Sequence, residues 1–210
     1  MKQIIIGILK FTSLYYPLRK WWRVLKIKEW ERKGRPLPPP HVVKQQTLFD
    51  YAEMYGLKVL VETGTLFGDM IEAMMNRFDR IYSIELSKDL FERAKERFKE
   101  AHTVELIHGD SGNEIRSVLN KINEPALFWL DGHYSGESTA RGTYDTPISN
   151  ELKHILGKGY KGHVIIIDDA RCFGTSSGYP TIDELKKFIW SKRENLEIVV
   201  QDDSIRITPK

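Results

Sequence analysis

The sequence predicts an α/β protein with a central, mostly parallel sheet and helices on both of its faces. Two observations lead to this prediction. Short apolar segments alternate with helix-like segments along residues 57–167, and the chain then finishes in two apolar runs around a polar turn. The alternation is typical of parallel strands joined by helical crossovers, and the final runs indicate an antiparallel hairpin. We therefore expect a seven-stranded sheet of the Rossmann-like kind with a reversed terminal strand.

The expected strands are short, apolar and bounded by turn residues. They cover residues 57–61, 80–84, 104–107, 126–130 and 163–167, with the hairpin strands at 196–200 and 204–208. The expected helices have apolar residues at helical spacing. They cover residues 47–56, 69–77, 87–99, 112–121 and 148–156.

The first strand leads into a glycine turn, Glu62-Thr63-Gly64-Thr65-Leu66-Phe67-Gly68, which opens into a helix. The two glycines let the backbone approach a ligand closely, and the helix N-terminus offers free amide groups. Such a turn often serves only chain reversal, so the spacing to the next acid matters. Glu85 ends the second strand 23 residues after Glu62 (85 − 62), where a βαβ unit carries its ribose-binding carboxylate.

Polar residues also follow the third and fourth strands, where Asp110 and Ser111 end one and Asp131 ends the other. In an open parallel sheet these strand ends line one crevice, which is the expected ligand site. The dinucleotide fingerprint G-x-G-x-x-G is absent from the glycine turn, which argues against a dehydrogenase.

These residues resemble those of class I S-adenosylmethionine-dependent methyltransferases, and the resemblance covers roughly residues 47–210. It implies that the glycine turn contours the methionine part of the cofactor, that Glu85 holds the ribose hydroxyls and that Asp110 meets the adenine. The E-x-G-x-x-x-G form is closest to small-molecule O-methyltransferases. The implied cofactor-binding residues are Glu62, Thr63, Gly64, Thr65, Gly68, Glu85, Leu86, Asp110, Ser111 and Asp131.

Three acids are predicted to gather where the fourth and fifth strands end: Asp131, Asp168 and Asp169. Hard oxygen ligands of this kind suit Mg²⁺. The trio resembles the metal site of cation-dependent O-methyltransferases of the macrocin O-methyltransferase type, which act on sugar hydroxyls. Two alternatives stay open, namely that Asp131 contacts the cofactor amine and that Asp168 and Asp169 cap a helix or bind Arg171.

His133, two residues after Asp131, is the predicted general base, because imidazole titrates near neutral pH. With Asp131 it forms the predicted catalytic pair. The long loop that follows is rich in hydrogen-bonding groups, which favours a sugar over a flat apolar ring and is consistent with a lid. We expect Tyr134, Arg141 and Tyr144 from this loop, and Arg171 from a second loop, to bind the substrate.

Residues 1–41 differ from the rest of the chain in charge. They hold ten Lys or Arg and two Glu, a balance of +8, so that residues 42–210 carry 3 − 8 = −5. We expect a basic, aromatic arm with a proline-rich linker (1–41) and a methyltransferase domain (42–210). Residues 1–35 could contact a membrane surface, since cations mixed with Trp and Tyr suit the headgroup region. Packing on the domain or on a second subunit, and nucleic-acid binding, are the alternatives.

The single cysteine, Cys172, excludes an intrachain disulfide and favours a reducing, cytoplasmic compartment. The apolar N-terminal stretch is interrupted by Lys10 and lacks a small-residue cleavage site, so neither a membrane span nor a signal peptide is predicted.

Together these features predict an O-methyltransferase that uses S-adenosylmethionine and Mg²⁺ to methylate a hydroxyl of a sugar or glycan precursor, at the inner face of a membrane. A catechol-like phenol as acceptor, or a noncatalytic cofactor-binding module, are the alternatives. A nucleic-acid substrate is not expected, because the domain is acidic and has no Asn-Pro-Pro-Tyr-type motif. The family resemblance leaves a homodimer open.

Overall fold

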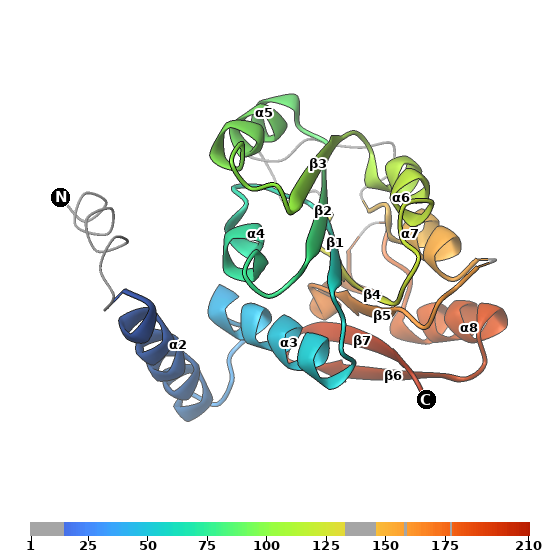
Figure 1. The fold of residues 1–210 in the computed structure, drawn as a ribbon. Helices are drawn as coiled ribbons and strands as arrows, with labels where there is room; N and C mark the ends of the chain where they lie inside the picture. Colours follow the sequence, from blue (N-terminus) through green and yellow to red (C-terminus); the bar gives the residue numbers. More distant parts are fainter. Residues whose placement is uncertain (1–14, 133–145, 158, 177) are drawn as a thin grey trace.

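The computed structural model describes residues 15–132, 146–157, 159–176 and 178–210. Its centre is a seven-stranded sheet in the order β3-β2-β1-β4-β5-β7-β6 (Figure 1). The strands are β1 (Val59–Thr63), β2 (Arg80–Glu85), β3 (Val104–His108), β4 (Ala126–Leu130), β5 (Val164–Ile167), β6 (Leu196–Gln201) and β7 (Ser204–Pro209). Strands β1 to β5 pair in parallel, and β7 is antiparallel to both of its neighbours. The predicted sheet is therefore confirmed.

The helices described are α2 (Tyr15–Arg32), α3 (His41–Met54), α4 (Asp69–Met74), α5 (Lys88–Arg97), α6 (Ser111–Leu119), α7 (Ile148–Ile155) and α8 (Ile182–Lys192), with a short 3₁₀ turn η1 (Ala170–Cys172). Helices α3, α4 and α5 pack on one face of the sheet and α6, α7 and α8 on the other. Alternate residues of β1 show the division. Leu60 packs in the apolar cluster with α3, α4 and α5, and Val61 packs in the cluster with α6, α7 and α8. The expectation of helices on both faces is confirmed.

Three details differ from the sequence expectation. Strand β1 runs to Thr63, so that Glu62 lies inside the strand, because its carboxylate is satisfied there by Ser83 on β2. Helix α3 begins at His41, six residues before the expected start, because Val42 and Val43 pack against Trp30 of α2. The pattern also left α2 and α8 unassigned.

The register of the sheet places the functional residues. Thr63 of β1 is paired with Ile84 of β2 on one side and Leu130 of β4 on the other. Parallel strands therefore end at one edge, and the residues that follow them lie together there. Every predicted site residue among the described residues belongs to this edge or to the loops that follow it.

Candidate functional site

The glycine turn after β1 is held in shape by left-handed backbone at three positions, Gly64 (φ 84°), Leu66 (φ 49°) and Gly68 (φ 77°). A side chain at position 64 would be blocked, since a Cβ there would lie 2.7 Å from the backbone oxygen of Asp131. Glycine is thus required at position 64 both by its φ angle and by the close approach of the loop after β4.

Two buried acids support this turn. Glu62 Oε2 accepts a hydrogen bond from the Ser83 hydroxyl at 2.6 Å, and that hydroxyl lies 2.7 Å from Thr65 Oγ1. Burial raises the pKa of Glu62 to about 8, although the hydrogen bond from Ser83 opposes the rise. Glu85 accepts hydrogen bonds from the backbone amides of Leu66, at 2.9 Å, and Ser87, at 2.8 Å.

These two hydrogen bonds orient the carboxylate of Glu85, the residue predicted to bind the ribose. Each Glu85 oxygen accepts one amide and retains a lone pair, because a carboxylate has about four acceptor sites. The neighbouring Leu86 carbonyl is 3.2 Å from the His108 ring. Residues Asp110 and Ser111 start α6 at the adjacent strand end. This arrangement fits a ligand that carries neutral hydroxyl groups, such as the ribose of S-adenosylmethionine.

The three acids predicted to bind a metal do come together. Asp131, Asp168 and Asp169 each present an oxygen within 4.8 Å of the others. Oxygens on one octahedral Mg²⁺ at about 2.1 Å lie about 3.0 Å apart when adjacent and about 4.2 Å when opposite, so the three carboxylates would have to draw together to hold such an ion. Burial raises the pKa of Asp168 to about 7, and the charge of Asp131 contributes, while Lys44 opposes the rise.

The sequence analysis missed Lys44, whose ammonium lies against two of the three acids. Its ammonium donates a hydrogen bond to Asp168 Oδ2 and lies 3.6 Å from Asp169 Oδ1. Burial alone would lower the pKa of Lys44, but the carboxylates, Asp168 foremost, hold it above its ordinary value. No sequence signal marks this lysine, because 124 residues separate it from Asp168.

Arg171, which is predicted to bind the substrate, is paired with two acids in the structure. Its Nη1 donates to Asp169 Oδ1 at 2.7 Å and also to Asp203 Oδ2, while its backbone amide donates to Asp203 Oδ1. The alternative in which Asp169 binds Arg171 is thus present in the structure. Substrate binding by Arg171 stays a prediction. It would require a guanidinium group that already donates to two carboxylates, those of Asp169 and Asp203.

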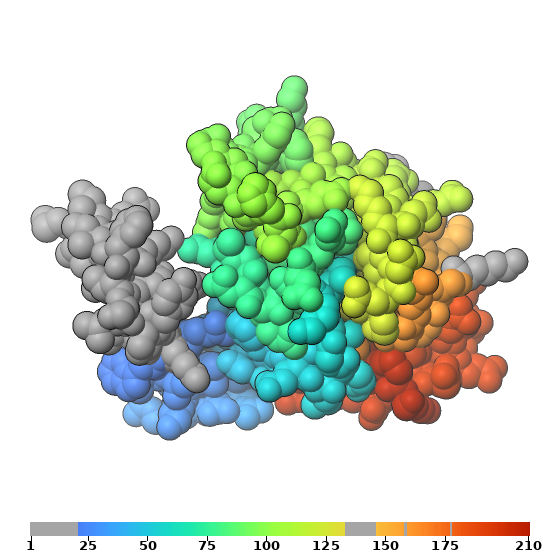
Figure 2. All heavy atoms as spheres, in the orientation of Figure 1, coloured from blue at the N-terminus to red at the C-terminus, as the bar shows by residue number. Residues whose placement is uncertain are grey.

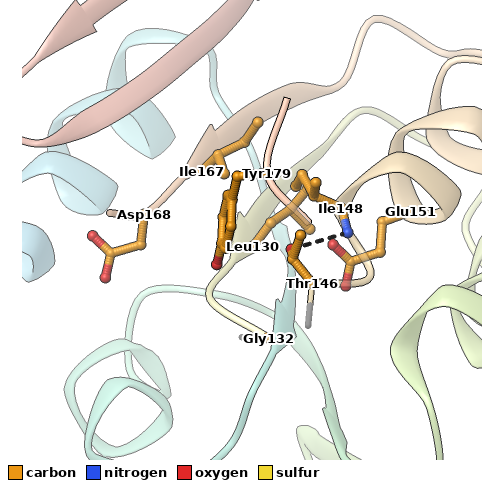
Figure 3. A pocket seen from close by; sticks show the side chains of 8 residues that line it. All are labelled: Leu130, Gly132, Thr146, Ile148, Glu151, Ile167, Asp168 and Tyr179. Carbon is orange, nitrogen blue, oxygen red and sulfur yellow. Dashed lines mark hydrogen bonds between the residues drawn. The ribbon is translucent and has the colours of Figure 1, made fainter. Parts of the chain in front are cut away.

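A pocket of about 220 Å³, including its opening to solvent, lies beside these acids (Figure 3). In the close-up, Asp168 and Glu151 lie on opposite sides of Tyr179. The residues that line the pocket are Leu130, Gly132, Thr146, Ile148, Glu151, Ile167, Asp168 and Tyr179. The sequence analysis did not identify Glu151, which is spaced like an ordinary helix residue of α7.

Glu151 is only 1% exposed, and burial raises its pKa to about 7. Hydroxyl groups of Ser111 and Thr63 lie next to it. Within the described part of the chain, Glu151 Oε1 and Thr63 Oγ1 have no hydrogen-bond partner. Unpaired polar atoms are rare in protein interiors, so these two atoms, close together at this corner of the site, are the ones there that no hydrogen bond among the described residues uses.

Four predicted site residues cannot be placed, because His133, Tyr134, Arg141 and Tyr144 lie outside the described residues. Their roles stay predictions.

Comparisons with known proteins agree on the fold. No protein-family model matches the chain. The SAH-bound methyltransferase PaMTH1 of Podospora anserina has a TM-score of 0.56 at 15% identity, covering 95% of this chain and 97% of that one. The O-methyltransferase of Bacillus cereus in complex with SAH has a TM-score of 0.55 at 16% identity, covering 90% of each chain. The chain thus has the class I S-adenosylmethionine-dependent methyltransferase fold.

One curated relative is similar in sequence. Ribosomal RNA small subunit methyltransferase A of Syntrophus aciditrophicus (strain SB) is 30% identical over 126 residues, covering 52% of this chain. The chain spans only 45% of that relative.

Proposed function

We propose that this chain is an S-adenosylmethionine-dependent O-methyltransferase that methylates a hydroxyl of a sugar or glycan precursor with the assistance of Mg²⁺. The observation that carries the proposal is the convergence of Asp131, Asp168 and Asp169 beside the glycine turn. One half of the edge suits a hydroxylated cofactor and the other suits a divalent cation. The fold shared with SAH-bound proteins supports the cofactor assignment.

The chain's own residues would position the reactants. When bound, S-adenosylmethionine supplies an electrophilic methyl group, and Mg²⁺ held by the three acids lowers the pKa of the acceptor hydroxyl. The close approach of the Gly64 backbone to the Asp131 backbone would bring the cofactor and the metal next to each other. Alignment of this kind is the principal contribution a protein can make to methyl transfer.

A base is needed for the hydroxyl proton, and we assign this role to His133, from its place in the sequence after Asp131. We assign substrate contacts to Tyr134, Arg141 and Tyr144 on the same basis, and to Arg171. We expect His133→Gln to lower turnover strongly while the affinity for S-adenosylmethionine stays near the wild-type value. An unchanged turnover would remove His133 from the mechanism.

Two other acceptors deserve a direct comparison. A catechol-like phenol would also use a metal, but it would favour a more apolar wall than the sequence of the loop after Asp131 predicts, since that loop is rich in hydrogen-bonding groups. The pocket itself mixes apolar and polar residues, so it does not separate the two acceptors. Ribosomal RNA is suggested by the name of the curated relative. The −5 balance of residues 42–210 argues against it, since nucleic-acid binding relies on positive charge.

The basic arm provides a second element of the proposal, attachment to an anionic membrane surface. One face of α2 packs on the domain, where Trp30 is 4% exposed against Val42 and Val43. The opposite face presents Trp21, which is 63% exposed, with Val24 and Leu25 one turn further on. Figure 2 shows α2 (blue) at the edge of the molecule.

This face combines apolar rings and cations, because Lys28 and Arg32 continue the same stripe. Within the described residues no helix is long and apolar enough to cross a membrane. We propose a peripheral contact on the cytoplasmic side, from the mixture of cations and aromatic residues in 1–35 and from the single cysteine. Vesicles with anionic lipid should sediment the full chain at low salt but not a Trp21→Ala/Trp22→Ala variant. A Val199→Ser/Val200→Ser variant is the control, since it removes exposed apolar groups elsewhere.

The central experiment is a titration of S-adenosylmethionine into the full chain with Mg²⁺ and then with EDTA, followed by methyl transfer to a panel of acceptors. The panel holds nucleotide-linked and lipid-linked sugars, a catechol and small-subunit ribosomal RNA. We expect cofactor binding in both conditions and methylation of a sugar only with Mg²⁺. Absence of cofactor binding would overturn the proposal, and cofactor binding without transfer would favour the noncatalytic module.

A further inference from the structure

Lys44 reaches the acid trio from a rigid part of the molecule. Its helix, α3, lies on the sheet through Leu48 and Ala52, which are fully buried and follow Lys44 at intervals of four residues. The apolar stripe of this helix thus continues as Lys44 at the point where the strands end. The side chain is 16% exposed, so its ammonium is nearly enclosed but keeps a path to solvent.

The position of this ammonium conflicts with that of a metal ion. It donates to Asp168 Oδ2 and lies close to Asp169 Oδ1, two acids that would supply ligands to a divalent cation. A metal needs the lone pairs that the ammonium occupies, and two cations a few ångströms apart repel each other. Acids outnumber cations here, since four carboxyl groups (Asp131, Asp168, Asp169 and Asp203) surround the two cations Lys44 and Arg171.

We propose that Lys44 is a built-in competitor for a divalent cation, whose ammonium occupies the acid trio and must leave Asp168 before Mg²⁺ or Mn²⁺ can bind. This inference rests on the metal-binding part of the proposed function. It assigns Lys44 a positioning role, in which the ammonium keeps three mutually repelling carboxylates together in the absence of metal. Arg171 has a different role. Its Nη1 also donates to Asp169, but the same nitrogen and the backbone amide donate to Asp203, which is not part of the trio.

The test is a direct measurement of Mn²⁺ binding to the full chain, by the electron paramagnetic resonance signal of free Mn²⁺. Lys44→Met removes the charge and keeps the length of the side chain, whereas Lys44→Arg keeps the charge. We expect Lys44→Met to bind Mn²⁺ at least about tenfold more tightly than wild type, and Lys44→Arg to bind no more tightly than wild type.

Two further variants separate competition from general effects. Lys58→Met makes the same change in net charge on an exposed lysine at the opposite end of β1, and should leave Mn²⁺ affinity near wild type. Adding Asp168→Asn to Lys44→Met should abolish the tight binding, which places the ion at the trio. The thermal unfolding of each variant reports whether it folds.

Equal Mn²⁺ affinity in wild type and folded Lys44→Met would overturn the inference, as would absence of binding in both. Neither result depends on S-adenosylmethionine, whose binding is measured separately. A chain that binds the cofactor but shows no competition would keep the methyltransferase assignment and lose only the role of Lys44.

Discussion

The carboxylates at the two halves of the site are stabilised in opposite ways. Glu62 and Glu85, around the glycine turn, accept hydrogen bonds from neutral donors, a hydroxyl group and two backbone amides. Asp168 and Asp169, after β5, are paired with the cations Lys44 and Arg171. The first half keeps acceptor capacity for neutral hydroxyls, whereas the second already binds positive charge. This difference is the basis of the proposal that the cofactor lies at the first half and a divalent cation at the second.

The largest expected effect comes from breaking the cation-binding half alone. We expect Asp168→Asn to lower methyl transfer at least about 100-fold, because the charge that would hold the metal is lost, while cofactor affinity changes little. Methyl transfer to the acceptor found in the panel measures the first effect, and calorimetric titration the second. Asp203→Asn is the matched control, since Asp203 is likewise a buried acid paired with a cation, in its case Arg171, but is not part of the trio. Equal losses in the two variants would contradict a special role of the trio.

Replacing Gly64 should weaken cofactor binding without acting on the three acids directly. We expect Gly64→Ala to weaken S-adenosylmethionine binding about 100-fold, because the new Cβ would push the loop after β4 out of place. Gly56→Ala has the same kind of left-handed backbone, at φ 62°, but its Cβ would meet nothing within 4 Å. It should cost about 1 kcal/mol of stability and leave binding intact. If both variants bind equally well, the close approach at Gly64 is unimportant.

The pH dependence of stability should sharpen the comparison. The pKa values of Glu62 and Glu151 are raised to about 8 and about 7 in the folded protein, from 4.5. The native state therefore holds these protons more tightly than the unfolded chain, and the stability contributed by these two groups falls as pH rises from about 4.5 to 8.

Glu151→Gln should remove part of this fall. We compare the free energies of unfolding of the variant and the wild type at each pH. The difference, variant minus wild type, should increase by roughly 1 to 3 kcal/mol between pH 5 and pH 8. Urea unfolding of the cofactor-free chain at the two pH values measures the gain. A pH dependence identical to that of wild type would mean that Glu151 is ionised at no cost.

The smallest effect is expected at Ser83, whose hydroxyl joins Glu62 to Thr65. Ser83→Ala should cost roughly 1 to 3 kcal/mol and reduce cofactor affinity several-fold, because a buried carboxylate loses its donor. Thr181→Ala removes the N-cap of α8, where the Thr181 hydroxyl is bonded to Glu184 within the same helix, and should cost about 1 kcal/mol without any change in cofactor binding. A parallel loss of cofactor affinity in Thr181→Ala would show that stability alone explains the result at Ser83.

Much of the fold followed from local patterns that depend on neighbouring residues only. The alternation of apolar strands and helices predicted the seven-stranded sheet, since each element must bury its own apolar face. Helix α8 also had a local signal, the capping box formed by Thr181 and Glu184, which the search for apolar periodicity overlooked. Helix α2 had a weaker one, because its apolar residues are divided between a packed face and an exposed face.

The sequence by itself determined the acids at the strand ends and their convergence, because parallel strands in register end at one edge. Only the tertiary structure decided how the charges at that edge are compensated. Lys44 comes from a helix that precedes the sheet, and Arg171 pairs with Asp203 from the terminal hairpin. Glu151 became a buried acid through the packing of α7 beside Thr63 and Ser111. Such contacts join residues far apart in the chain, so their partners are fixed by how the helices and strands pack in three dimensions and leave no local pattern in the sequence.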